Sequence, residues 1–195
     1  MSFPDSQLLL QDRMARLEPL QLSHTDELLP VALHESLWRF TSVQITNKDA
    51  LARYIHQAME EKSRGVSLPF IIRSAQNGAA VGCTRFGNYE PLHKRVEIGW
   101  TWLSPALHGT GFNQHCKLLL LDYAFDTLNL NRVELKTSAR NLISQRAMEK
   151  IGATREGVLR RHMIQENGEI RDTVYYSFIK EEWPAIRAER FAALG

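Results

Sequence analysis

A glycine-rich turn between a strand pattern and a helix pattern constrains the fold more than any other feature of this sequence. Apolar and polar residues alternate over 94–103, as in a strand, and an apolar run extends beyond residue 112 to about Thr127. Gly109 and Gly111 lie between them, and glycine permits both a sharp turn and close approach of a ligand to the backbone. Free amides and the helix dipole at such a helix start favour an anion. The turn is a candidate anion site, with a plain strand-to-helix turn as the alternative.

The other periodic segments predict a mixed sheet with helices on both faces. Strands are expected at 14–20, 68–74, 80–89, 131–138, 154–164 and 171–179. Helices are expected at 23–40, with Ser23 as cap and Pro30 as a break, and at 47–62, 141–152 and 181–194. Asn-Gly pairs at 77–78 and 167–168 indicate tight hairpins. A meander followed by strand–helix crossovers implies one α/β (α+β) domain over 1–195, with ligands at the carboxyl ends of strands.

Composition and charge exclude several classes of function. No apolar run approaches the roughly 20 residues that cross a bilayer, and the chain starts without the basic segment of a signal peptide. The net charge of +2 gives DNA binding no global support, although 131–161 carries eight basic and three acidic side chains. That segment is a candidate positive wall for an anionic cofactor. The cysteines, Cys83 and Cys116, have no metal-ligand spacing and predict buried thiols in a cytoplasmic protein rather than a disulfide.

Two motifs in the segment 96–161, "HGTGFN" and "NLISQRAMEKIGATREG", resemble the cofactor segments of the GNAT acyltransferase superfamily. Within that superfamily, the sequence is similar to the RimJ/RimL type of ribosomal-protein N-terminal acetyltransferases, over nearly the whole chain. The family loop has Gln or Arg, two residues, Gly, one residue, then Gly or Ala. Gly111 fits the central glycine, whereas His108 and Asn113 depart from the first and last positions. The departure at His108 implies a lower and pH-sensitive cofactor affinity.

The resemblance implies that acetyl-coenzyme A lies in a cleft where two parallel strands splay apart. Its pyrophosphate would contact the amides of 108–113, and its pantetheine arm would pair with the open strand edge at 100–103. The thioester would reach the region between Glu97, Trp102 and Asn141. The residues implied in cofactor binding are Trp102, Leu103, His108, Gly109, Thr110, Gly111, Phe112, Asn113, Asn141 and Arg146.

Acetyl transfer requires a base for the attacking amine, donors for the thioester oxygen and a partner for the departing thiolate. The resemblance makes Glu97 the base, directly or through water, and backbone amides later in the same strand the oxyanion donors. A strand glutamate paired with Arg95 or Lys136 is the alternative for Glu97. Ser144 is the candidate thiolate partner, in the first turn of a helix that Asn141 would cap. A merely structural first-turn serine is the alternative.

The acceptor is implied to be a primary amine, chiefly a protein N-terminal α-amino group, attacked in a ternary complex. A polyamine or antibiotic acceptor, which an acidic groove would favour, and a non-catalytic acyl-coenzyme A-binding domain are the alternatives. Trp38, Trp100 and Trp102 are candidates for the acceptor groove, and we expect one of them to contact substrate. His34 and His115 have no evident partner, no metal site is expected, and a homodimer is left open.

Overall fold

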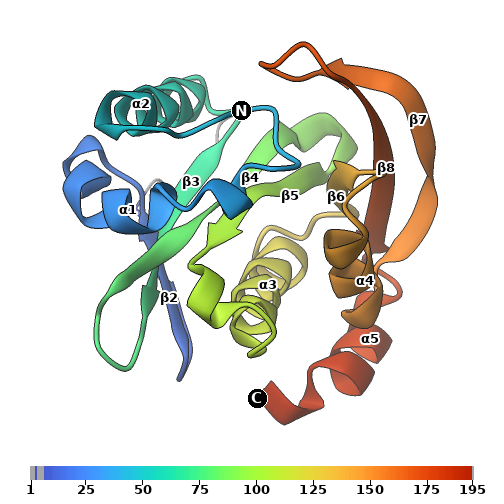
Figure 1. The fold of residues 1–195 in the computed structure, drawn as a ribbon. Coiled ribbons are helices and arrows are strands. Elements are labelled where there is room, and N and C mark those ends of the chain that lie inside the picture. Colours follow the sequence, from blue (N-terminus) through green and yellow to red (C-terminus); the bar gives the residue numbers. More distant parts are fainter. Residues whose placement is uncertain (1–2, 4–6, 195) are drawn as a thin grey trace.

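The computed structural model describes residue 3 and residues 7–194, which form one eight-stranded sheet with helices on both faces (Figure 1). The strand order is β1-β2-β3-β4-β5-β6-β8-β7. All neighbouring strands are antiparallel except β5 and β6, which are parallel. The strands are β1 (Leu10–Gln11), β2 (Ala15–Pro19), β3 (Leu68–Ser74), β4 (Ala80–Glu90), β5 (Arg95–Leu103), β6 (Arg132–Ser138), β7 (Thr154–Ile164) and β8 (Ile170–Ile179). The mixed sheet predicted from the sequence is confirmed.

The helices follow the predicted order. They are α1 (Thr25–Ala32), α2 (Lys48–Ser63), α3 (Phe112–Asp122), α4 (Leu142–Lys150) and α5 (Trp183–Arg190). A π-helical segment, Tyr123–Thr127, extends α3 to its predicted end. Asn47 caps α2, because its side-chain oxygen accepts a hydrogen bond from the amide of Ala50 at 2.9 Å. Among the described residues, none of the helices has the length and apolar character needed to cross a membrane.

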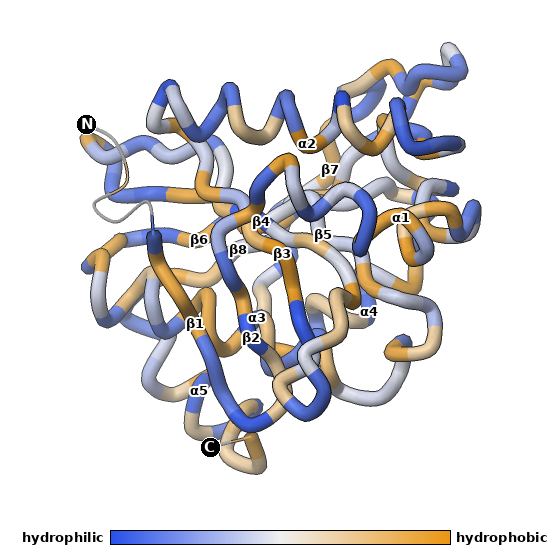
Figure 2. Tube along the Cα trace, turned by 90° about the vertical axis from the view of Figure 1, so that its left-hand side faces the viewer, coloured by the Kyte–Doolittle hydropathy of each residue, from blue (hydrophilic) through white to orange (hydrophobic). Residues whose placement is uncertain are grey.

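One face of the sheet carries α1 and α2 on an apolar cluster of its own. Leu28 of α1 and Leu51 and Ile55 of α2 are buried in the same cluster as Ile71 of β3 and Trp102 of β5. The coils of α2 alternate between hydrophobic and hydrophilic colours along its length (Figure 2), as expected for an amphipathic helix on a sheet. These two helices therefore cover the middle strands from one side.

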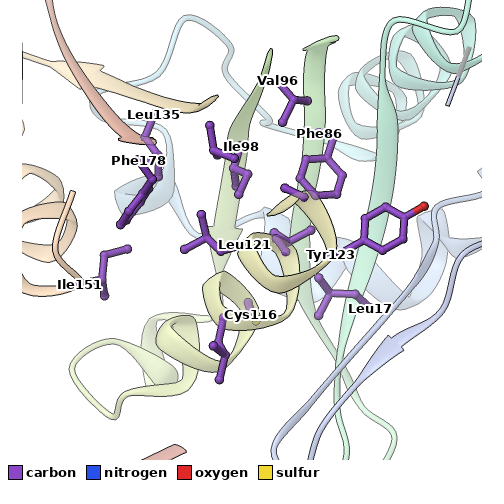
Figure 3. Close-up of a cluster of buried hydrophobic side chains, with 14 of the residues drawn as sticks. Leu17, Phe86, Val96, Ile98, Cys116, Leu121, Tyr123, Leu135, Ile151 and Phe178 are labelled. Carbon is purple, nitrogen blue, oxygen red and sulfur yellow. The ribbon is translucent and has the colours of Figure 1, made fainter. Parts of the chain in front are cut away.

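The opposite face is built around α3. Cys116 and Leu121 of α3 lie among Leu17 of β2, Ile98 of β5 and Phe178 of β8 (Figure 3). These residues are all buried and belong to one apolar cluster. Because β2 and β8 lie on opposite sides of the β5–β6 junction, α3 spans the junction and fastens the two parts of the sheet together.

The two cysteines lie on opposite faces of the sheet. Cys83 belongs to the cluster beneath α1 and α2, and Cys116 belongs to the cluster around α3. Burial raises the pKa of both thiols, that of Cys116 to about 12. Both are free and buried, which confirms the prediction of two buried thiols.

Strands β5 and β6 separate soon after they begin. Their parallel pairing covers only 95–97 of β5 against 132–134 of β6. Beyond it, β5 continues beside β4 and β6 continues beside β8. The carboxyl-terminal parts of two neighbouring strands thus enclose a gap, which is where an open sheet binds ligands. We call this space between β5 and β6 the gap.

An extra residue interrupts the β4–β5 ladder at Trp100. Arg85 pairs with Gly99 but Cys83 pairs with Trp102, so three steps along β5 match two along β4. Trp100 has a left-handed φ of +50°, and the arrangement is a β-bulge. Lys136 of β6 contacts both the Trp100 ring and the carboxylate of Glu97, which places those two side chains on one face. Without the bulge, strict alternation would send them to opposite faces.

The first predicted helix is shorter than its pattern suggested. It was expected at 23–40, but α1 ends at Ala32. The indole Nε1 of Trp38 donates to the carbonyl oxygen of Ala32 at 2.7 Å, so a side chain from beyond the helix satisfies this carbonyl. The prediction of Ser23 as the cap is also wrong, because Ser23 lies inside a 3-10 turn, Leu22–His24, that precedes α1.

Candidate active site

The glycine turn leads into α3 with its backbone open on one side. Gly109 and Gly111 have φ values of +78° and +88°, in the left-handed region that favours glycine. A Cβ atom on Gly109 would meet nothing within 4 Å, and one on Gly111 would meet only the side chain of Gln114, at 3.6 Å. The turn therefore holds a glycine conformation without crowding from the protein, and it leaves room for a ligand at the start of α3.

Several amides of this turn have no protein acceptor. The amide of Thr110 donates to the carbonyl of Leu107, but those of Gly109, Gly111 and Asn113 donate to no group in the described chain. The side-chain Oδ1 of Asn113 is also buried without a hydrogen-bond partner among those residues. Free donors at the start of a helix suit a phosphate group. The three free amides, rather than the Asn113 Oδ1, which is itself an acceptor, therefore fit the pyrophosphate of acetyl-coenzyme A.

The side chains of Thr110 and Phe112, which also belong to the turn, interact with the rest of the protein. The hydroxyl of Thr110 donates to the carbonyl of Leu107 at 2.8 Å and accepts from the amide of Phe112 at 3.3 Å. The ring of Phe112 is buried in the cluster around α3. Both side chains thus shape the turn, and the backbone amides of both residues already donate within the chain.

His108 contacts the end of β5, a position that the resemblance did not imply. Its Nε2 lies 3.0 Å from the carbonyl oxygen of Leu103. The amide of Ser104 donates to Val81 of β4 at 2.8 Å, so Leu103 must point its N–H and C=O toward the opposite, unpaired edge. By the same alternation the amide of Trp102 faces β4. Leu103, rather than Trp102, therefore offers free backbone groups to a pantetheine arm, and His108 occupies one of them.

The first turn of α4 begins shortly after β6 ends. Asn141 caps α4, with its Oδ1 accepting from the amide of Ser144 at 3.1 Å. The half-buried Ser144 has a hydroxyl without a partner in the part of the chain that the structure describes. Arg146 lies exposed on the same helix. The cap interpretation of Asn141 is confirmed, and the Ser144 hydroxyl is free to bind a ligand.

Glu97 lies buried at the start of the gap, as the last residue of β5 that pairs with β6, with 4% of its surface exposed. Its Oε2 accepts from Nζ of Lys136 at 2.8 Å and from Nδ2 of Asn88 at 2.7 Å. The ion pair with Lys136 is the alternative that the sequence left open. No described residue donates to Oε1. A Cβ atom at position 99 would lie 2.9 Å from this Oε1, so Gly99 keeps the second carboxylate oxygen uncrowded.

The three tryptophans expected near the acceptor have different surroundings. Trp38 and Trp102 are 2% and 5% exposed, and their ring centroids lie 5.5 Å apart in the core. Trp100 is half-buried, with the guanidinium of Arg85 and the ammonium of Lys136 over its ring at 4.7 Å and 5.8 Å from the centroid. Trp38 and Trp102 therefore pack the core, and the ring of Trp100 alone among these three lines the charged part of the gap.

Lys117 is a buried cation that the sequence patterns did not single out. It is 6% exposed, and its Nζ donates to the hydroxyl of Thr101 at 3.0 Å. That hydroxyl also lies 2.7 Å from the hydroxyl of Thr84. No carboxylate of the described residues forms an ion pair with Lys117, and burial lowers the pKa of its ammonium to about 8. The available signal was a lysine within the apolar run "CKLLLL" of a helix.

Lys117→Met should stabilise the protein at neutral pH. The folded pKa of about 8 lies below the ordinary value of 10.5, so between these pH values the unfolded chain binds more protons and wild-type stability rises with pH. Removing the buried charge should increase the free energy of unfolding at pH 7 by about 1–4 kcal/mol. It should also abolish the increase in stability between pH 8 and pH 10.5. Urea unfolding at pH 7 and pH 9.5 measures the stability and its pH dependence, with the exposed Lys150→Met as control. A variant that keeps the wild-type slope would contradict the assignment.

His115 has a partner, contrary to the sequence prediction. Its Nδ1 lies 2.6 Å from Oδ2 of Asp12, 103 residues away in sequence. The other carboxylate oxygen of Asp12 accepts from the amides of Met14 and Ala15. The pair thus fastens α3 to the start of β2 and plays no part in the gap.

Comparison with known proteins connects this geometry to one family. Residues 15–154 match the acetyltransferase (GNAT) domain. YdaF of Bacillus subtilis (strain 168) is 34% identical over 107 residues, 55% of this chain and 57% of that protein. The crystal structure of a candidate acetyltransferase from T. thermophilus is 34% identical and covers 100% of both chains with a TM-score of 0.88. RimJ of Mycobacterium smegmatis, solved with CoA-disulfide, shares the fold at 22% identity, with a TM-score of 0.79 over 96% of this chain and 93% of that one.

The matched region contains every part of the site. It runs from the start of β2 to the start of β7, and so includes the splayed strands, the glycine turn and α4. The match to YdaF spans just over half of that relative's length. The chain belongs to the GNAT acetyltransferase family.

Proposed function

We propose that this chain is an acetyl-coenzyme A-dependent N-acetyltransferase that acts on a primary amine by direct attack in a ternary complex. The observation that carries the proposal is the gap between β5 and β6. The free amides of the glycine turn lie at its mouth, and the buried Glu97 lies where the two strands separate. GNAT acetyltransferases use acetyl-coenzyme A as the donor. A donor on one side of the gap and an amine on the other would meet there without a covalent enzyme intermediate.

The donor would be held chiefly by backbone groups. The amides of Gly109, Gly111 and Asn113 would take the pyrophosphate. The free edge at Leu103 would pair with the pantetheine arm, as an added strand does. Pairing of the arm with the carbonyl of Leu103 requires the ring of His108 to leave that carbonyl, and the amide of Leu103 stays available for the thioester oxygen. Arg146 and the other basic residues of 131–161 would add a positive field.

Glu97 would accept the proton of the amine, directly or through a water molecule. Its Oε2 is engaged by Lys136 and Asn88, which orients the carboxylate and leaves Oε1 for the proton. The amide of Leu103, on the open edge, would donate to the thioester oxygen as negative charge develops there. The base and the donor to the thioester oxygen would therefore both come from β5, with β6 supplying the positioning cation.

Ser144→Ala should lower kcat by about ten- to a hundredfold, because the departing thiolate would lose one hydrogen-bond donor as its charge develops. The dissociation constant of coenzyme A should change little. The pH profile should shift downward nearly in parallel, since a serine hydroxyl does not titrate in the working range. Steady-state kinetics from pH 6 to pH 10 would measure this. An unchanged kcat would leave Ser144 as a structural first-turn residue.

The finer proposal for the acceptor is a protein N-terminal α-amino group, as in the RimJ/RimL branch. YdaF is named as a candidate ribosomal N-acetyltransferase, and RimJ shares the fold. A polyamine acceptor would need an acidic groove, whereas Lys136 forms an ion pair with Glu97 and Arg171 lies within electrostatic range of it. A single cytoplasmic domain belongs to the same proposal. A homodimer stays a prediction that sedimentation would test.

The test is a turnover screen with acetyl-coenzyme A. Release of free coenzyme A would be followed with N-terminal peptides, polyamines and aminoglycosides as acceptors. Turnover with peptides supports the RimJ/RimL assignment. Turnover with polyamines or aminoglycosides alone would replace it with small-amine acetylation. Binding of coenzyme A without turnover on any acceptor would favour a non-catalytic domain.

A further inference from the structure

A small pocket lies at the end of β6, beside the gap. It is bounded by Arg39 and Phe40 from the segment after α1, by Ser138 of β6, and by Gln165 and Arg171 at the tip of the β7–β8 hairpin. Its volume is about 40 Å³, enough for a small polar group such as a carboxylate. We call it the arginine pocket.

The walls of the arginine pocket are tied to each other. Nη1 of Arg171 donates to the carbonyl of Phe40 at 3.2 Å, and Nε2 of Gln165 donates to the carbonyl of Thr41 at 2.7 Å. These bonds join the hairpin tip to the segment after α1, across more than 120 residues of sequence. The pocket is therefore preformed, with its donors held in place before a ligand arrives.

The arginine pocket has an excess of positive charge. Arg39, Arg140 and Arg171 line it, against one carboxylate, that of Glu169. Glu169 lies 3.5 Å from Arg140 on the exposed rim. Arg39 and Arg171 form no ion pair with any described carboxylate, and Nη2 of Arg171 donates to no described residue. Free guanidinium donors in a confined space favour a carboxylate or a similar planar anion.

The arginine pocket is close to Glu97. Lys136, which contacts Glu97, and Ser138, which lines the pocket, are two residues apart on β6 and so face the same side, about 6–7 Å apart. Burial lowers the pKa of the Arg171 guanidinium, and the charge of Glu97 opposes this shift. Arg171 thus lies within electrostatic range of the proposed base. An extended acceptor with its amine at Glu97 would reach the pocket one to two residues later.

We infer that the arginine pocket binds a carboxylate of the acceptor, so that the enzyme selects primary amines with an acidic group about two residues away. The inference rests on the proposed acetyl transfer and names the acceptor class for it. An acidic side chain on the second residue of a peptide places a carboxylate at this distance from the N-terminal amine. The terminal carboxylate of a free dipeptide is the other source of the same chemistry.

The test compares peptides with C-terminal amides that differ only at the second residue, as Ala-Glu, Ala-Gln and Ala-Lys, with acetyl-coenzyme A as donor. We expect kcat/KM to be at least about tenfold higher for glutamate than for glutamine, the value of one charge-assisted hydrogen bond, and lowest for lysine. Free Ala-Ala and its amide form the second arm. A preference for the free dipeptide larger than that for Ala-Glu would assign the pocket to a terminal carboxylate. Equal kcat/KM for Ala-Glu and Ala-Gln, and for the two forms of Ala-Ala, would overturn the inference.

Variants of the pocket arginines test whether the preference for glutamate over glutamine arises in the arginine pocket. Arg171→Gln and, on the more exposed side, Arg39→Gln should each reduce the glutamate-to-glutamine ratio of kcat/KM to about one to three. Arg190→Gln, on α5, removes a charge outside the pocket and should keep the wild-type ratio. A ratio unchanged in both pocket variants would refute the inference.

If the proposed acetyl transfer itself is wrong, no acceptor will be turned over. In that case, calorimetric titration of the same peptides into the coenzyme A complex would test whether the arginine pocket binds a carboxylate. Tighter binding of Ala-Glu than of Ala-Gln, lost in Arg171→Gln, would support it, and equal binding would refute it.

Discussion

Glu97→Gln is expected to lower kcat by about a hundred- to ten-thousandfold near neutral pH, the range that a general base contributes. Glutamine keeps the size of the side chain and can still contact Lys136 and Asn88, but it cannot take a proton from the amine. The rate should recover partly as pH rises, because the acceptor amine then loses its proton unaided. The measurement is kcat from pH 6 to pH 10, on an acceptor identified in the turnover screen.

The matched control is Glu134→Gln. Glu134 lies opposite Glu97 in the parallel pairing of β5 and β6, and its carboxylate contacts Arg132 at 2.9 Å. This variant removes a carboxylate from the same junction without changing the contacts of Glu97. It should keep the wild-type rate and pH profile. If Glu97→Gln also keeps them, the Glu97–Lys136 ion pair is structural, and the base is a water chain or the neutral amine itself.

Gly111→Asp should weaken the binding of coenzyme A by at least about a hundredfold. The aspartate would place a negative charge beside the free amides of Gly111 and Asn113, where the pyrophosphate is proposed to bind. Loss of two charge-assisted hydrogen bonds accounts for about 3 kcal/mol or more, and charge repulsion adds to it. Calorimetry with coenzyme A measures the dissociation constant directly.

The control for backbone strain is Gly78→Asp. Gly78 has a similar left-handed φ, +72°, with nothing within 4 Å of a Cβ atom, and it lies in the turn between β3 and β4. Both variants introduce the same side chain into the same kind of backbone conformation. Only the change at Gly111 should affect coenzyme A. A folded Gly111→Asp protein that binds with wild-type affinity would show that the turn is not the pyrophosphate site.

Elements whose own residues determine them were predicted well. The Asn-Gly pairs at 77–78 and 167–168 form the expected hairpins, and the strand before the glycine turn and the helix after it lie where their periodicities indicated. Asn141 caps its helix as predicted, through a contact with a residue only three positions further along the chain. In each case, the residues whose interaction determines the local structure lie within the short sequence segment from which the prediction was made.

Features that depend on distant contacts were missed. The end of α1 depends on the indole of Trp38, six residues beyond it. His115 depends on Asp12, and the burial of Lys117 depends on Thr101. The bulge at Trp100 inserts a single residue into β5, and no alternation pattern reveals which face each later side chain will reach. The candidate site thus depends on a register change that only the pairing with β4 defines.

The bonds between the hairpin tip and the segment after α1 also have a consequence for folding. The bonds from Gln165 and Arg171 join residues 124 and 131 apart in sequence, and a third, from the amide of Gln44 to the carboxylate of Glu166, joins residues 122 apart. Each therefore closes a very long loop. Such contacts become favourable only when both parts of the sheet are already in place. This side of the gap is therefore expected to form last during folding. It should also open first under native conditions, so that the amides of the hairpin tip exchange with solvent sooner than those of β5 and β6.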